Sequence, residues 1–188
     1  VTDIIKYDRR IANRIIEEFM LIANETVAEQ FFWAQIPFVY RVHENPDPEK
    51  IRDFVKFIGA FGYTLKGDIE EIHPKELQKL LGDIENTKEE LVISTLMLRS
   101  LKQARYSPIC TGHFGLAAKY YTHFTSPIRR YPDLQIHRII KETIDESLNE
   151  KRLNRLKAIV EKASEQSSIR EREADEAQRQ VEDLRKAE

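Results

Sequence analysis

Residues 122–138 read THFTSPIRRYPDLQIHR, and this stretch decides how the second half of the chain is expected to fold. Ser126 and Pro127 together predict the start of a helix, because a serine hydroxyl can accept an unpaired backbone N–H and proline has the φ of the first helical position. Arg129 and Arg130 then fall in the first turn. Backbone N–H groups and the helix dipole favour an anion there, and a guanidinium group can bind two phosphate oxygens. The stretch therefore predicts a phosphate-binding helix terminus.

The segments on either side of this stretch have different patterns. Pro132 lies six residues after the predicted cap, so we expect it to bend the helix. Residues 109–124 contain two glycines and many aromatic residues, which predicts a strand or extended loop. Residues 151–186 are predicted to form a long polar helix with a buried apolar stripe: Leu153, Leu156, Ile159, Val160, Ala163, Ile169, Ala174, Ala177, Val181 and Leu184.

Four further helices are predicted in the first half of the chain. Residues 9–32 form an amphipathic pattern in which apolar residues recur every three to five positions: Ile11, Ile15, Phe19, Ile22 and Val27. Pro48 and Pro74 each open a shorter helix. Thr87, with the glutamate three residues later, predicts a capping box before a helix of roughly five turns. A strand is predicted at 38–43, where apolar and polar residues alternate.

Composition indicates one folded domain without a strong overall charge. The chain has 188 residues, 41% of them hydrophobic and 33% charged, and its formal net charge is −2. From Arg99 to Arg138, however, seven Lys or Arg residues face one acid, and six of the seventeen aromatic residues of the chain lie there. Such a segment suits phosphate contact plus base stacking, whereas the alternative is a scattered, solvated face.

Cysteine content and the absence of targeting segments indicate the compartment. Cys110 is the single cysteine, so an intrachain disulfide is excluded and a reducing environment is expected. The sequence shows no signal peptide or membrane-spanning run, which predicts a cytoplasmic protein with no membrane partner. Because the chain begins with Val1 instead of methionine, we expect it to be a piece of a longer protein or a cleavage product.

Residues 122–138, together with GHFGLA at 112–117 and IIEEFMLIANETVAE at 15–29, closely resemble the catalytic (RNB) domain of the ribonuclease II / ribonuclease R family. The resemblance implies processive 3′-to-5′ hydrolysis of single-stranded RNA to nucleoside 5′-monophosphates. It also implies Mg²⁺ held by aspartates near the start of that domain. Those aspartates and the flanking OB-type RNA-binding domains have no counterpart here. Residues 1–188 are therefore expected to be the C-terminal part of the catalytic domain, inactive alone, with no DNA substrate.

Site residues follow from the same resemblance. Arg129 matches the active-site arginine of the family, which contacts the phosphate of the bond that is cut; the alternative is a surface pair with Asp133. The remaining expected RNA contacts are Glu17, Asn24, Arg130, Tyr131 and Gln178. No metal ligand is expected in this chain, and we interpret the histidines as structural side chains.

Two other classes of function stay open at this level. One is an RNA-binding module without catalysis, from a degenerate paralogue, and the other is a purely structural helical module. In each case the sequence predicts a helix-rich α+β fold with about six helices and a few short strands, an incomplete portion of the RNB catalytic domain fold. An incomplete fold should leave an apolar face exposed or cause self-association.

Overall fold

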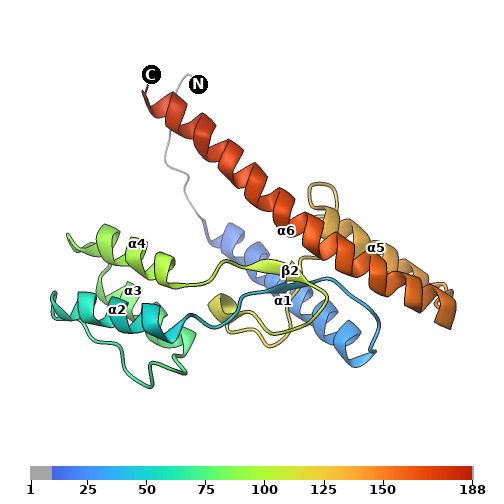
Figure 1. Cartoon of the computed structure of the whole chain (residues 1–188), viewed down its shortest axis with the longest axis horizontal. Helices are drawn as coiled ribbons and strands as arrows, with labels where there is room; N and C mark the ends of the chain where they lie inside the picture. Colours follow the sequence, from blue (N-terminus) through green and yellow to red (C-terminus); the bar gives the residue numbers. More distant parts are fainter. Residues whose placement is uncertain (1–9, 188) are drawn as a thin grey trace.

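Six α-helices and a two-stranded sheet form within residues 10–187, the part of the chain that the structure, a computed structural model, describes (Figure 1). The elements in chain order are α1 (Ile11–Trp33), β1 (Tyr40–Val42), α2 (Pro48–Gly59), α3 (Pro74–Asp83), α4 (Glu90–Ser100), β2 (Arg105–Ser107), the short 3₁₀ helix η1 (Phe114–Leu116), α5 (Tyr131–Ile144) and α6 (Glu150–Ala187). This confirms the helix-rich α+β fold predicted from the sequence.

The two strands are short and antiparallel. Tyr40 lies opposite Ser107, and Arg41 lies opposite Tyr106. The predicted strand at 38–43 is thus confirmed in its central residues. The helix of roughly five turns predicted after Thr87 is shorter: α4 ends at Ser100, because the chain becomes extended at the next residue and then pairs with β1.

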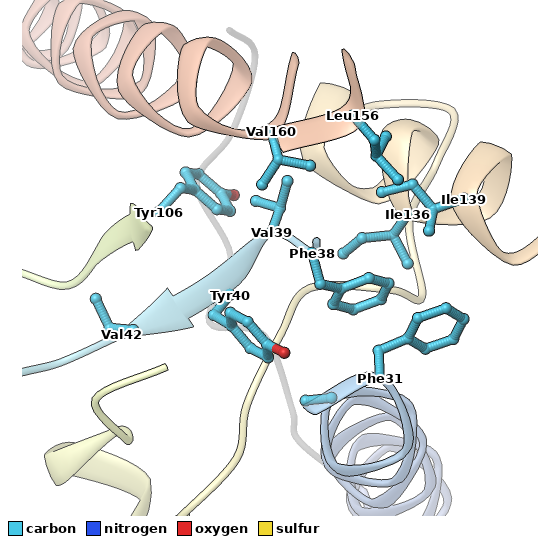
Figure 2. Packing of buried hydrophobic residues seen from close by; sticks show 11 residues of the cluster. Phe31, Phe38, Val39, Tyr40, Val42, Tyr106, Ile136, Ile139, Leu156 and Val160 are labelled. Carbon is cyan, nitrogen blue, oxygen red and sulfur yellow. The ribbon is translucent and has the colours of Figure 1, made fainter. Parts of the chain in front are cut away.

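We call residues 11–43 and 105–187 the sheet lobe. Its core is built from α1, the two-stranded β1–β2 sheet, α5 and the first half of α6 (Figure 2). Phe31 of α1 stacks on Phe38 with ring centroids 4.4 Å apart, while Ile136 of α5 and Val160 of α6 close the other side. These contacts place α5 and α6 side by side over the two-stranded sheet (Figure 1).

We call residues 48–101 the helical lobe, which consists of α2, α3 and α4. Its core contains Ile51, Ile58, Leu80 and Ile93, all of them buried. Asp47 caps α2 and His73 caps α3, each by accepting a backbone N–H from two residues later. The two helix starts predicted at prolines are therefore confirmed.

The GHFGLA segment joins the two lobes. Phe114 is buried in the core of the helical lobe, and its N–H donates to the carbonyl of His43 at 2.8 Å. Gly112 has φ +84 and accepts a hydrogen bond from the His43 N–H at 3.0 Å. The N–H of Gly115 donates to His43 Nδ1 at 3.1 Å, so close that a Cβ on Gly115 would lie 2.9 Å from that nitrogen. Both glycines in this segment are therefore structural requirements.

The burial of α1 is the reverse of what its apolar pattern predicts. Asn24, Ala28 and Phe31 are buried, whereas the apolar residues near its N-terminal end are exposed, among them Ile11 and Phe19. The predicted helix start at Arg9 lies outside the described residues. An exposed apolar face is thus present, as expected for an incomplete fold. Within the described residues, no helix combines the length and the apolar character that crossing a membrane requires.

Two further predictions about helices are corrected. Thr87 does not cap α4, because its hydroxyl donates to the carbonyl of Ile84, and Glu90 instead accepts the N–H of Asn86. In α6 the apolar stripe is buried only in the first half, because the second half extends beyond the other helices (Figure 1). The exposed residues of the predicted stripe are Ile159 in the first half and Ala174, Ala177, Val181 and Leu184 in the second.

Candidate nucleic-acid interface

Helix α5 begins at Tyr131, four residues later than the first helical residue, Pro127, that the sequence predicts. Arg130 is its N-cap residue, with extended backbone angles, and Pro132 is the second helical residue. A proline in the first turn loses no hydrogen bond, whereas inside a helix it would remove one and clash with the preceding turn. Pro132 therefore sets the start of the helix instead of bending it.

Ser126 to Arg130 form a tight turn in front of α5. The carbonyl of Ser126 accepts the N–H of Arg129 at 3.3 Å and the N–H of Arg130 at 3.1 Å. Both backbone donors are therefore used inside the turn. The prediction that the backbone N–H groups of these two arginines join their guanidinium groups at one phosphate is therefore wrong.

Asp133 holds this turn against the helix. Its carboxylate is buried and accepts the backbone N–H of Ser126 at 2.8 Å and Nη2 of Arg130 at 2.7 Å. A carboxylate in the first helical turn also complements the positive end of the helix dipole. Asp133 therefore pairs with Arg130, and not with Arg129 as the alternative interpretation required.

A pocket of about 510 Å³ lies between this turn and α6. One wall carries Arg129, Arg130, Tyr131 and Pro132, with Tyr106 of β2. The other wall is a face of α6 made of Gln166, Ser167, Arg170, Glu171, Ala174 and Asp175. Three of the predicted site residues, Arg129, Arg130 and Tyr131, are thus brought together.

The charged groups of the pocket differ in whether they are already paired. Arg130 is paired with Asp133, and Arg170 with Glu173 one turn away on α6. Among the described side chains, none forms a hydrogen bond or an ion pair with the guanidinium of Arg129, which is exposed at the rim. Arg129 is therefore the cation of this pocket that is available to an incoming anion.

Arg41 of β1 holds the α6 wall in place. Its Nη1 lies 2.6 Å from Oε2 of Glu171, and its guanidinium lies over the ring of Tyr106 at 4.6 Å. The N–H of Tyr106 also donates to Oγ of Ser168 at 2.9 Å. Because these contacts fix α6 to the β1–β2 sheet, they set the width of the pocket.

His123 lies behind the pocket and is neutral. Its Nδ1 lies 2.9 Å from the hydroxyl of Tyr106. Burial, together with the charges of Arg130 and Arg41, lowers the pKa of His123 to about 3. Burial also raises the pKa of Tyr106 to about 12. The pair therefore adds no charge to the pocket near pH 7.

The three other predicted RNA contacts lie elsewhere. Asn24 is buried, donates to the hydroxyl of Tyr121 at 3.1 Å and accepts the N–H of Phe124 at 2.9 Å. Its amide therefore ties α1 to the segment that leads into the turn. Glu17 is half-buried on α1 and does not line the pocket. Gln178 is exposed on α6, where it donates to Glu182.

The other histidines make contacts inside the protein. His137 Nε2 lies 2.9 Å from the carbonyl of Phe124, and its ring stacks on that phenylalanine. The rings of His43 and His113 meet edge to face, and burial, followed by the charge of His43, lowers the pKa of His113 to about 4. The described residues bring together no three His, Cys, Asp or Glu side chains that could hold a metal ion. The described residues therefore do not fit a magnesium site.

The residues that fix the second wall in place did not follow from the sequence. Arg41, Tyr106 and Glu171 come from three elements, and their proximity depends on tertiary packing. A local signal exists for α6, because its pocket residues recur at helical spacing with small or polar side chains. The basic segment 99–138 also contains Tyr106.

Three comparisons place the chain among known proteins. The sequence profile of the RNB domain matches residues 1–146. Ribonuclease R 1 of Lactococcus lactis is 47% identical over 186 residues, covering 99% of this chain and 23% of that protein. RNase R of Mycoplasma genitalium, solved in complex with ribose-methylated single-stranded RNA, superposes with a TM-score of 0.87 at 28% identity, covering 96% of this chain and 28% of that one.

A structure described as that of yeast Ssd1, a pseudonuclease, is also similar. It superposes with a TM-score of 0.68 at 29% identity, covering 85% of this chain and 20% of that one. In all three proteins the chain corresponds to between a fifth and three tenths of the relative's length.

Proposed function

The chain belongs to the RNB-domain family, and on that premise we propose that it is the RNA-binding part of a processive 3′-to-5′ exoribonuclease that hydrolyses single-stranded RNA to nucleoside 5′-monophosphates. The single observation that carries the proposal is the exposed guanidinium of Arg129, which has no partner among the described side chains and stands at the rim of a pocket. RNase R of Mycoplasma genitalium, which has this fold and has been solved in complex with single-stranded and with double-stranded RNA, supports it.

In this proposal Arg129 binds the phosphate at which the bond is cut. A guanidinium can donate to two phosphate oxygens at once and can stabilise the negative charge that develops on them. The turn at 126–130, held by Asp133, orients the arginine, and Tyr131 beside it offers a ring to the sugar or base. Magnesium, the attacking water and their ligands belong to other segments of the longer protein, so the 188-residue chain alone should not hydrolyse RNA.

The test is kinetic and uses the longer protein that contains this chain. Arg129→Ala and Arg129→Lys should each lower kcat by about 10²–10³ and change RNA affinity far less, because lysine cannot reproduce a bidentate contact. Arg99→Ala is the matched control, because it removes the same charge from an exposed position on α4 in the helical lobe. Near-normal turnover of Arg129→Lys would assign Arg129 a positioning role only.

The similarity to yeast Ssd1 favours a second candidate, an RNA-binding module without catalysis. Both candidates predict that the chain binds single-stranded RNA and that binding weakens with salt. They differ in whether a 5′-labelled RNA is shortened by the longer protein in magnesium. Binding without shortening would select the module, and absence of binding at any salt concentration would contradict both.

A further inference from the structure

Three aromatic side chains lie together on the surface of the sheet lobe, where α1 ends. Phe32 contacts Trp33 edge to face with centroids 5.4 Å apart, and Tyr120 lies 4.7 Å from Phe32 and 6.3 Å from Trp33. Trp33 is 66% exposed and Phe32 is 38% exposed. A continuous aromatic surface is therefore open to solvent.

Phe32 and Trp33 lie outside the core of this lobe, whereas Tyr120 is partly buried against it. Phe31, the preceding residue of α1, is the one that packs inside, stacked on Phe38. After Trp33 the chain turns sharply at Gln35, which has φ +54, and leads back to strand β1. The turn leaves the indole without a covering segment in the described part of the chain.

Polar and cationic groups surround the aromatic surface. The ammonium of Lys119 lies 5.4 Å from the centre of the Tyr120 ring. Phe32 lines two hollows, one of about 480 Å³ that also contains Thr111 and Lys119, and one of about 540 Å³ that contains Lys157. Each hollow beside the rings thus contains a lysine that can meet a phosphate.

We propose that Phe32, Trp33 and Tyr120 form a second RNA contact, a platform on which bases of single-stranded RNA stack while Lys119 and Lys157 bind the adjoining phosphates. Aromatic rings interleaved with cations are the arrangement by which proteins hold single strands without reading their sequence. None of the three rings lines the pocket of Arg129. The inference rests on the proposed function, since it takes RNA as the ligand of this chain.

The chain provides its own probe, because Trp33 is its single tryptophan. We expect a ten-nucleotide oligoadenylate to quench the fluorescence of Trp33, and an abasic oligonucleotide of the same length to leave it unchanged. Arg99→Ala should leave the quenching in place, because it removes a charge from an exposed position on α4, away from the three rings.

Binding measured by fluorescence anisotropy of a labelled RNA gives the second readout. Trp33→Ala and Tyr120→Ala should each raise Kd about tenfold, and Trp33→Phe should restore most of the affinity. Phe61→Ala is the control, because Phe61 is an exposed aromatic residue that pairs with Phe57 in the helical lobe. Its affinity should equal that of the unmodified chain.

Three outcomes would overturn the inference. If RNA binds through Arg129 but neither quenches Trp33 nor depends on it, the platform is wrong and the proposed function stands. If Trp33 fluorescence changes with protein concentration alone, and sedimentation shows a dimer, the surface joins two copies of the chain. If no variant and no unmodified chain binds RNA, the proposed function fails together with the platform.

Discussion

The two lobes differ in what their interiors contain. The core of the helical lobe is apolar, and Ser100 is the buried polar side chain that accompanies it among the described residues. The sheet lobe buries six polar or charged side chains among the described residues: Asn24, Ser107, Thr122, Asp133, Gln135 and Ser164. Several of these hydrogen-bond to irregular segments, which helix and sheet ladders leave unsatisfied. The comparison teaches that the pocket is held by buried polar contacts, while the helical lobe is held by apolar packing.

Removing a buried carboxylate should cause the largest difference in stability between the two lobes. Asp133→Asn should lower the free energy of unfolding by about 3–5 kcal/mol, because it leaves the largely buried Arg130 without its counter-charge. The same change on the helical lobe, Asp53→Asn, affects an exposed pair with Lys56 and should cost less than about 1 kcal/mol. Urea unfolding of both variants measures the difference, and equal losses would refute it.

The ion pairs of the two lobes give a smaller contrast. Arg41→Ala should cost about 1.5–3 kcal/mol, because its pair with Glu171 is largely buried and also packs on Tyr106. Arg52→Ala removes an arginine from an exposed pair with Glu70 and should cost about 0–1 kcal/mol. A double-mutant cycle with each glutamate would isolate the pair energies. A coupling no larger for Arg41 than for Arg52 would mean that α6 is held by packing alone.

The glycines separate the joint between the lobes from an open helix position. Gly115→Ala should destabilise by about 1–3 kcal/mol, because the new methyl group would meet Nδ1 of His43. Gly82→Ala, in α3, meets nothing within 4 Å and should stabilise by about 0.5–1 kcal/mol. Thermal unfolding of the two variants should therefore move in opposite directions. If both variants gained stability, the contact between His43 and Gly115 would have no role in joining the lobes.

The last contrast is the pH dependence of stability. An unfolded histidine binds a proton near pH 6.5, whereas folded His123 binds one only near pH 3. The lowered pKa of His123 therefore has no effect on stability above pH 6.5. As the pH falls from 6.5 to 3, the unfolded state binds the proton first, and the free energy of unfolding decreases by about 1.4 kcal/mol per pH unit. His123→Asn should reduce the slope by this amount in urea unfolding at pH 4.5–7.5. An unchanged slope would show that folding does not lower the pKa of His123.

The local signals that succeeded depend on backbone chemistry. Asp47 before Pro48 and His73 before Pro74 predict helix starts correctly, because a cap and a fixed φ act within a few residues. Ser126 before Pro127 has the same signal and fails. There the N–H of Ser126 donates to Asp133, seven residues away, and Pro132 supplies a second possible start. A local rule cannot choose between two nearby starts when a tertiary hydrogen bond decides.

The sequence by itself determined the family, the number of helices, the extended segment before the arginines and the presence of Arg129 beside Tyr131. These follow from spacing and residue type, which are properties of a single stretch of chain. Only the tertiary structure decided that the polar side of α1 faces the core, that Asn24 holds a loop, and that Arg41 packs on Tyr106 and pairs with Glu171 of the wall opposite Arg129. The physical reason is that these contacts join residues more than sixty positions apart in the chain, and such distances are fixed only when the whole chain has folded.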